Sequence, residues 1–299
     1  MSLNPIFGQK CECFNFEWQG ASVSGRYIPN AAITIPISID DLPYEFNMQL
    51  DLGAVESMFY GNSIKPYFQL HAELTNKIDS TQTFYIQSQE NVKLRNVNLK
   101  MGEINFENIE VGLFSGFGDT LTIDSVKTKN SKHIGTIAPD VFQSKIVIID
   151  YPKSEICIAD KIPRKYKNLN YQEFTLEQGR IKLPFEIMGK TEMLMFDTGS
   201  SMFSLITTQL NAEQISDKII VDSLQITSWG EEYTIYGLNV VSNVKFSGEN
   251  LPPALVYYFK KPIYDQFFEQ EDMWGITGNS YFSSKTMVID YGSNKVGIK

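Results

Sequence analysis

The sequence contains an internal repeat, and this repeat constrains the fold more than any other feature. The segment from Gly135 to Tyr151 returns 140 residues later as the related segment from Gly275 to Tyr291. Eight of the 25 positions from 134 to 158 carry the same residue at this offset, whereas about one or two identities would arise by chance. The identical pairs are Gly135/Gly275, Phe142/Phe282, Ser144/Ser284, Lys145/Lys285, Ile149/Ile289, Asp150/Asp290, Tyr151/Tyr291 and Ile158/Ile298. The repeat predicts two similar halves, each ending in a turn or short helix followed by a hairpin.

A second pair of related segments opens each half. In the first half, strand-like segments lead to the sequence Asp51-Leu-Gly-Ala, and in the second half they lead to Asp197-Thr-Gly-Ser. Residues 46–50 alternate between apolar and polar, which is typical of a half-buried strand, and the apolar run 193–196 is typical of a fully buried one. Each half is therefore expected to place an acidic residue and a small-residue turn at the end of a strand.

Length and composition favour a mostly β protein of two units. A chain of 299 residues exceeds one average domain, and an aromatic content of 13% favours strands. We expect an N-terminal lobe over residues 1–160 and a C-terminal lobe over residues 161–299, with a basic, proline-containing connector near residues 161–170. Short helices are expected at residues 63–74, 139–143 and 263–271.

Charge and hydropathy exclude several classes of partner. The net charge of −9 makes nucleic acid and anionic membrane surfaces unfavourable partners. The longest apolar stretch, Leu251 to Phe259, contains two prolines, so no membrane span is predicted. The first residues lack the pattern of a signal peptide. The compartment stays open, because a secreted or periplasmic chain whose leader had been removed would look the same.

Histidine and cysteine are scarce in this chain. The two histidines, His71 and His133, are too few for a multi-histidine metal site, and we predict neither a metal nor a cofactor. The three cysteines, Cys11, Cys13 and Cys157, lack the spacing of metal ligands. We interpret them as buried or free thiols.

Two acids that end equivalent strands in a repeat indicate a carboxylate pair. When two carboxyl groups come together they cannot both ionise cheaply, so one of them keeps its proton. Such a pair can hold a water molecule, with one carboxylate as general base and the other as general acid. Asp150 and Asp290 are a second pair of repeated acids, and we interpret them as hairpin-turn residues.

These motifs resemble those of the two-lobed pepsin-like aspartic peptidases, or of a fused double retropepsin-like unit of the bacterial type. The residues that carry the resemblance are the Asp51 and Asp197 motifs and the later pairs Ile134-Gly135 and Trp274-Gly275, and it covers about residues 33–299. The resemblance implies the acid-protease fold, in which two β-barrel-like lobes related by a pseudo-twofold axis enclose a cleft. It also implies an endopeptidase that takes an extended peptide or protein, needs no cofactor, and is complete as a monomer.

The resemblance assigns roles to the residues of the two motifs. Asp51 and Asp197 would be the catalytic pair, and Gly53 and Gly199 would supply backbone donors. Ser200 would form a hydrogen bond with Asp197. The flap or cleft residues would be Tyr85 in the first half and Trp229 in the second.

One position departs from the family pattern and keeps two other functions open. Thr198 would supply half of a threonine pair that braces the two loops, but Leu52 stands where the family has Thr or Ser. Leucine cannot form a hydrogen bond through its side chain, so the Thr198 hydroxyl needs another partner. An alternative function is therefore a catalytically weak or inactive peptide-binding protein of the same fold. A third hypothesis is a β-rich surface or carbohydrate-binding protein, in which the two Asp turns would not meet.

Overall fold

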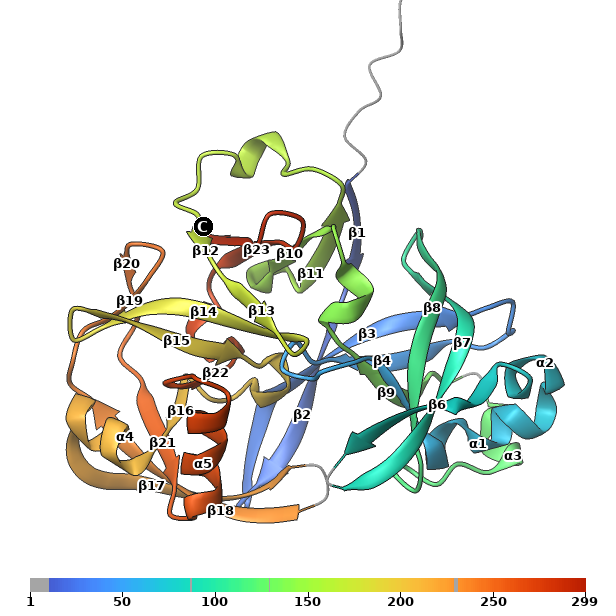
Figure 1. Cartoon of the computed structure of the whole chain (residues 1–299), viewed down its shortest axis with the longest axis horizontal. Coiled ribbons are helices and arrows are strands. Elements are labelled where there is room, and N and C mark those ends of the chain that lie inside the picture. Colours follow the sequence, from blue (N-terminus) through green and yellow to red (C-terminus); the bar gives the residue numbers. More distant parts are fainter. Residues whose placement is uncertain (1–10, 87, 129, 229–230) are drawn as a thin grey trace, which may run out of the picture.

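The chain folds mostly into β-strands, as the sequence predicts. The computed structural model describes residues 11–299 apart from 87, 129, 229 and 230. Its strands form three sheets (Figure 1). One sheet belongs to the first half of the chain, one belongs to the second half, and the third contains strands of both halves.

The sheet of the first half has eight strands. Its order across the sheet is β2 (Glu17–Val23), β3 (Arg26–Ile39), β4 (Phe46–Leu50), β9 (Lys132–Ile137), β5 (Met58–Tyr60), β8 (Ile104–Phe114), β7 (Gln89–Met101) and β6 (Ile78–Ile86). Its helices are α1 (Gly61–Leu70), α2 (Ala72–Thr75) and α3 (Ile123–Val126). The predicted alternation is confirmed in β4, where Phe46, Met48 and Leu50 are fully buried and the residues between them are partly exposed.

The sheet of the second half repeats this plan. Its order is β17 (Ser216–Ser228), β18 (Glu231–Val240), β21 (Leu255–Phe259), β16 (Leu205–Thr207), β22 (Gly275–Thr277), β15 (Lys190–Phe196), β14 (Arg180–Ile187), β19 (Val244–Phe246) and β20 (Glu249–Asn250), and β13 (Thr175–Glu177) also pairs with β14. Its helices are α4 (Gln209–Ile215) and α5 (Pro262–Gln270). In both halves the strand before the acidic motif pairs in parallel with the repeated segment, β4 with β9 and β15 with β22.

The third sheet joins the two halves. Its order is β1 (Cys11–Asn15), β11 (Glu155–Ala159), β10 (Ile146–Asp150), β23 (Thr286–Asp290), β24 (Lys295–Ile298) and β12 (Gln172–Glu173). The central strands β10 and β23 are antiparallel, and Ile148 lies opposite Val288. These two residues are equivalent in the sequence repeat, so the two copies are related by a local twofold axis between them.

The short helices agree in part with the sequence. The helix expected at 63–74 is divided into α1 and α2, because His71 between them has an extended backbone. The segment 139–143 forms a 3₁₀ helix, and the segment 263–271 corresponds to α5. Helix α4 was not expected, and Thr208 caps it by accepting a hydrogen bond from the N–H of Asn211. The 3₁₀ helices are η1 (Pro139–Phe142), η2 (Tyr151–Lys153), η3 (Arg164–Tyr166), η4 (Thr198–Ser200) and η5 (Asn279–Phe282).

The repeated glycines lie where two strands come close together. A Cβ atom at Gly135 would lie 2.1 Å from the carbonyl oxygen of Met58, and one at Gly275 would lie 2.4 Å from that of Ile206. A larger residue at either position would therefore separate the strand from its neighbour. The requirement for close backbone contact explains the two hydrophobic-glycine pairs of the sequence.

The cysteine interpretation is wrong for two of the three residues. Cys13 in β1 and Cys157 in β11 lie directly opposite each other and form a disulfide. Only Cys11 is a free thiol. No sequence pattern predicted this pair, because its two members are 144 residues apart and strand pairing brings them together.

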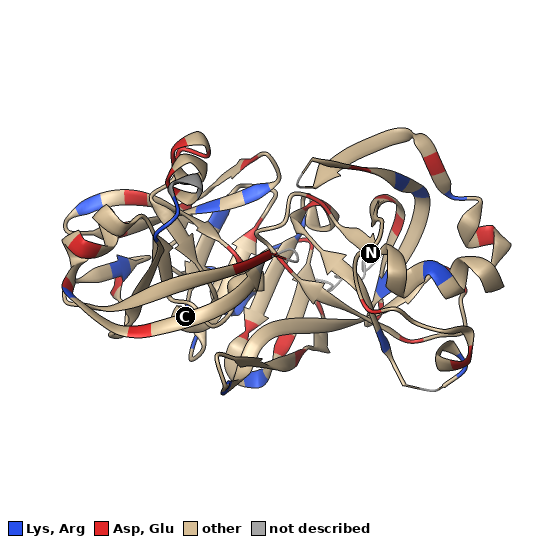
Figure 2. Ribbon diagram, turned by 90° about the horizontal axis from the view of Figure 1, so that it is seen from below, with Lys and Arg blue, Asp and Glu red and all other residues tan. Residues whose placement is uncertain are grey.

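Two features of the structure concern nucleic-acid and membrane partners: the distribution of charged residues and the length of the helices. Lys and Arg are interspersed with Asp and Glu over both halves of the ribbon (Figure 2). Among the residues that the structure describes, no helix has the length and apolar character needed to cross a membrane.

The disulfide is expected to stabilise the fold mainly by restricting the conformations of the unfolded chain. We predict that the double variant Cys13→Ser/Cys157→Ser loses about 2–5 kcal/mol in free energy of unfolding, since the disulfide closes a long loop. Urea denaturation followed by circular dichroism measures this loss. The matched control is Cys11→Ser, which should unfold like the wild type. Equal stability of the double variant and this control would contradict the prediction.

Candidate active site

The two acidic motifs occupy equivalent places in the two halves. Asp51 follows β4, and its N–H donates to the carbonyl of Ile137 at 2.9 Å. Asp197 follows β15, and its N–H donates to the carbonyl of Thr277, also at 2.9 Å. Each loop is therefore fixed by the end of the repeated strand beside it, β9 or β22.

The two loops meet, and each carboxyl group lies against the glycine of the other loop. A Cβ atom at Gly53 would lie 2.7 Å from Cγ of Asp197. A Cβ atom at Gly199 would lie 2.8 Å from Oδ2 of Asp51 and 3.0 Å from Oδ1 of Asp197. Any residue larger than glycine would push into the carboxyl pair. The third hypothesis of the sequence analysis required that these turns stay apart, and this geometry contradicts it.

Local hydrogen bonds orient both carboxyl groups. Oδ1 of Asp51 accepts the N–H groups of Gly53 at 3.0 Å and Ala54 at 3.1 Å. Oδ1 of Asp197 accepts the N–H of Ser200 at 3.1 Å, and Oδ2 accepts the Ser200 hydroxyl at 2.7 Å. The predicted contributions of Gly53 and Ser200 are thus present. In the second loop the backbone donor is Ser200 rather than Gly199, whose role is to leave room for the carboxyl groups.

The pair is strongly coupled electrostatically. Burial, followed by the negative charge of Asp197 and a hydrogen bond with it, raises the pKa of Asp51 well above its ordinary value. The N–H groups of Gly53 and Ala54 act in the opposite direction and lower this pKa. Since burial and the neighbouring charge prevail, Asp51 holds its proton to a higher pH than an isolated carboxyl group does.

Thr198 braces the two loops although its expected threonine partner is a leucine. The Thr198 hydroxyl accepts the N–H of Leu52 at 2.9 Å and donates to the carbonyl of Leu50 at 2.7 Å. Both partners are backbone groups, so the brace does not need a hydroxyl at position 52. The Leu52 side chain is fully buried in the main core instead.

A buried polar network that the sequence analysis missed supports the Asp197 loop. Nδ2 of Asn279 donates to the Ser201 hydroxyl at 2.7 Å and to the carbonyl of Thr198 at 3.2 Å. The hydroxyl of Tyr151 donates to Oδ1 of Asn279 at 2.6 Å. Tyr151 comes from the first half of the chain, so this network also ties the halves together. Its members lie far apart in the sequence, which left no motif to find.

An aromatic hydroxyl lies near Asp51 in the first half. The Tyr60 hydroxyl is 2.5 Å from the hydroxyl of the buried Thr136. Burial raises the pKa of Tyr60 to about 12, and the charge of Asp51 adds to this shift. His133 lies in β9, and its ring packs edge-on against the ring of Tyr60 in β5.

The β2–β3 hairpin, which the sequence analysis did not predict, lies beside the segment that follows the Asp197 loop. Strands β2 and β3 extend from the first half onto the second, where Arg26 pairs with Asp222 at 2.6 Å. The hydroxyl of Tyr257 donates to the same carboxylate at 2.8 Å. A cavity of about 350 Å³ lies between this hairpin and the segment after the Asp197 loop, at Ser201 and Met202.

The two predicted flap residues have different outcomes. Tyr85 lies near the tip of the β6–β7 hairpin, is 66% exposed, and donates its hydroxyl to Glu90 at 3.0 Å. Its ring is therefore largely exposed to solvent. Trp229 lies outside the residues that the structure describes. Asp150 and Asp290 are confirmed as turn acids, because Asp150 accepts the N–H of Lys153 and Asp290 accepts those of Gly292 and Ser293.

Potential metal ligands gather away from the acid pair. Within the described part of the chain, the group whose ligand atoms are close enough to hold an ion is Cys11, Cys13 and Cys157. It belongs to the shared sheet and not to the two acidic loops.

No protein-family model matches the chain, and no curated protein matches its sequence.

The Thr198 brace can be tested by removing its hydroxyl. In Thr198→Val the buried N–H of Leu52 and carbonyl of Leu50 lose their partner, and we expect a loss of about 1–3 kcal/mol in free energy of unfolding. Thr198→Ser keeps the hydroxyl and is the matched control, with a smaller loss. Urea denaturation of both variants measures the difference. If the valine variant proved as stable as the serine variant, the brace would not contribute to stability.

The raised pKa of Asp51 predicts a pH dependence of stability. Between the ordinary carboxyl pKa and the raised one, the folded chain holds a proton that the unfolded chain has lost. The free energy of unfolding must therefore fall as the pH rises through this interval, by at most about 1.4 kcal/mol per pH unit for one proton. In Asp51→Asn the free energy of unfolding should fall less steeply with pH. The control variant Asp124→Asn, at an exposed acid, should show the same fall as the wild type. Parallel pH profiles for Asp51→Asn and wild type would contradict this coupling.

Proposed function

We propose that this protein is an aspartic endopeptidase, which hydrolyses peptide bonds with a water molecule held by Asp51 and Asp197. The observation that carries the proposal is the contact of the two carboxyl groups, each lying against the glycine of the opposite loop. The raised pKa of Asp51 supports it, because general acid–base catalysis by a carboxyl pair needs one protonated and one ionised member.

The proposed reaction uses the pair twice. The ionised carboxylate takes a proton from water, whose oxygen adds to the peptide carbonyl carbon, while the protonated carboxyl gives its proton to the carbonyl oxygen. The tetrahedral intermediate then collapses: the carbon–nitrogen bond breaks and a proton passes to the leaving amine. No covalent enzyme intermediate forms. The pair titrates as a unit, so the proton before substrate binds is shared by the two carboxyl groups.

We also propose that the fold is the bilobal acid-protease fold, with lobes over residues 1–160 and 161–299. Support comes from the register of the two halves. Gln49 pairs with Thr136 in the first half, and Met195 pairs with Ile276 in the second. Gln49 and Met195 each lie two residues before the acid of their half. The strand pairing therefore places Asp51 and Asp197 at equivalent positions in the two halves.

The proposed substrate is an extended peptide or an unfolded protein segment. The β6–β7 and β17–β18 hairpins extend from opposite sides toward the middle of the molecule (Figure 1), and both β6 and β17 end their sheets. An edge strand offers unpaired backbone groups to an extended chain. Exposed Tyr85 is the proposed contact from the first hairpin. Both acids belong to one chain, so a monomer contains the whole proposed site.

A second candidate function is binding of a peptide without cleavage. One observation favours it: the β2–β3 hairpin lies beside the segment that follows Asp197, across a cavity that both line. A hairpin in that place would restrict access of a substrate to one side of the acid pair.

Cleavage assays with matched variants distinguish these functions. We expect the wild type to cleave an unfolded, carboxymethylated protein, with a rate that falls as the pH rises above the raised pKa of the pair. Asp51→Asn and Asp197→Asn should each lower this rate by at least about 10³-fold, while Asp124→Asn should not change it. Peptide mapping by mass spectrometry gives the rates.

Two results would contradict the endopeptidase proposal. Equal cleavage by wild type and by both acid variants would indicate another source of activity. Binding of the unfolded protein by folded wild type, without cleavage from about pH 3 to pH 7, would favour the peptide-binding function.

A further inference from the structure

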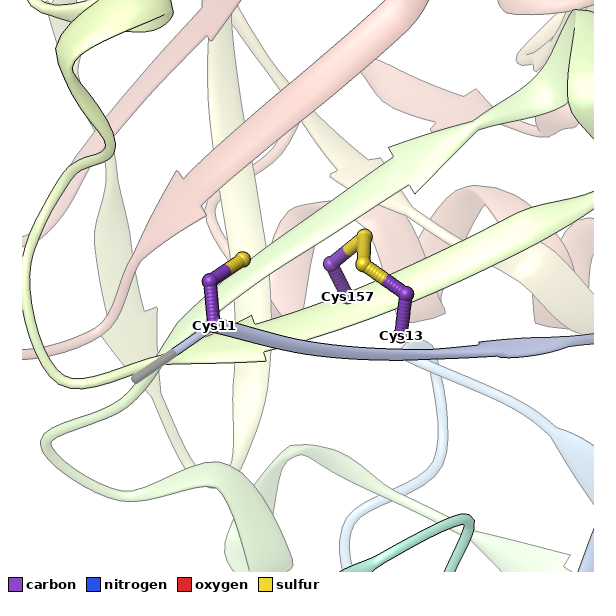
Figure 3. A group of neighbouring side chains, drawn as sticks. All are labelled: Cys11, Cys13 and Cys157. Carbon is purple, nitrogen blue, oxygen red and sulfur yellow. A yellow bond between two sulfur atoms is a disulfide. The ribbon is translucent and has the colours of Figure 1, made fainter. Parts of the chain in front are cut away.

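Three sulfur atoms gather on one face of the shared sheet, at its edge. Cys13 lies opposite Cys157, and Cys11 is two residues earlier in β1, so its side chain points to the same face (Figure 3). The three sulfur atoms lie within 4.8 Å of one another. Two of them form the disulfide, and the third is the exposed free thiol.

We propose that reduction of the Cys13–Cys157 disulfide creates a three-thiolate site for a thiophilic divalent cation of the Zn²⁺ type. Cysteine thiolates bind Zn²⁺ at about 2.3 Å, which places the sulfurs of a tetrahedral site about 3.8 Å apart. The observed cluster needs only small side-chain rotations to reach this spacing. Glu155 is near the fourth position, since its Oε2 lies 3.6 Å from the sulfur of Cys157.

The carboxylate of Glu155 adds negative charge beside the sulfur cluster, which favours a bound cation. A metal ion also displaces the thiol protons of its cysteine ligands.

The proposed conversion is balanced with a dithiol as reductant. The sulfur–sulfur bond between Cys13 and Cys157 breaks and takes up two electrons and two protons, while the dithiol becomes a disulfide. The cation then forms three metal–sulfur bonds, and Cys11, Cys13 and Cys157 each release one proton. Oxidation by a disulfide of the same class would reverse the first step and expel the ion, so the site is open to metal only in the reduced protein.

Titration with Cd²⁺ tests the proposal, because thiolate–Cd²⁺ bonds give an ultraviolet charge-transfer band. The full chain is reduced with a phosphine, freed of reductant by gel filtration without oxygen, and titrated with Cd²⁺. We expect one ion per chain, the charge-transfer band, and the release of protons. Zn²⁺ should compete for the same site.

Variants identify the ligands. Cys11→Ser keeps the disulfide pair and the fold, yet should weaken Cd²⁺ binding by the reduced protein by more than about 100-fold, since even loss of an outer-shell partner costs about 10- to 100-fold. Cys13→Ser and Cys157→Ser should do the same. Glu155→Gln should weaken binding less than any cysteine change. The oxidised wild type should bind no Cd²⁺ with the charge-transfer band.

Three results would overturn the proposal: absence of the band in reduced wild type, binding by reduced Cys11→Ser as tight as by wild type, or equal binding by the oxidised protein. Circular dichroism of each sample shows whether the chain is folded. If reduction alone unfolds the chain, the proposal requires that Cd²⁺ restore the fold in wild type and fail to do so in Cys11→Ser.

Discussion

The antiparallel pairing of β10 with β23 joins the two halves of the chain where their repeated segments end. Ile148 lies opposite its repeat equivalent Val288, so a local twofold axis between these strands relates the two copies of the repeat. The strands that precede β10 and β23 in each repeat, β9 and β22, hold the two acidic loops through equivalent hydrogen bonds. The β10–β23 pair therefore helps to position Asp51 against Asp197, together with the Thr198 brace and the hydrogen bond from Tyr151 to Asn279.

Once the loops meet, the burial of two acids has to be offset by local hydrogen bonds. Each carboxyl group receives donors from its own turn, and the glycine of the other turn leaves room for it. The brace between the loops is asymmetric, since the hydroxyl of Thr198 bonds to backbone groups on either side of Leu52. A leucine is tolerated there because the hydrogen bonds of a brace can end on the main chain, while the side chain adds to the core.

The first strands of the chain connect features that lie in different sheets. Strand β1 carries two of the three clustered cysteines, and the β2–β3 hairpin that follows reaches the Asp197 side through Arg26 and Asp222. Strand β1 and the β2–β3 hairpin follow one another in the chain, so residues 11–39 contact both the shared sheet and the second half.

The sequence by itself determined the mostly β character, the two-part repeat and the two acids at strand ends, because period, burial and turn chemistry are local properties. It also identified Gly135 and Gly275 as equivalent residues of the repeat, while the close backbone contacts that require them appear only in the structure. Only the tertiary structure decided that Cys13 pairs with Cys157 and that Tyr151 supports Asn279. Such contacts join residues more than a hundred positions apart, and their partners are set by strand pairing and packing, which leave no fixed spacing in the sequence.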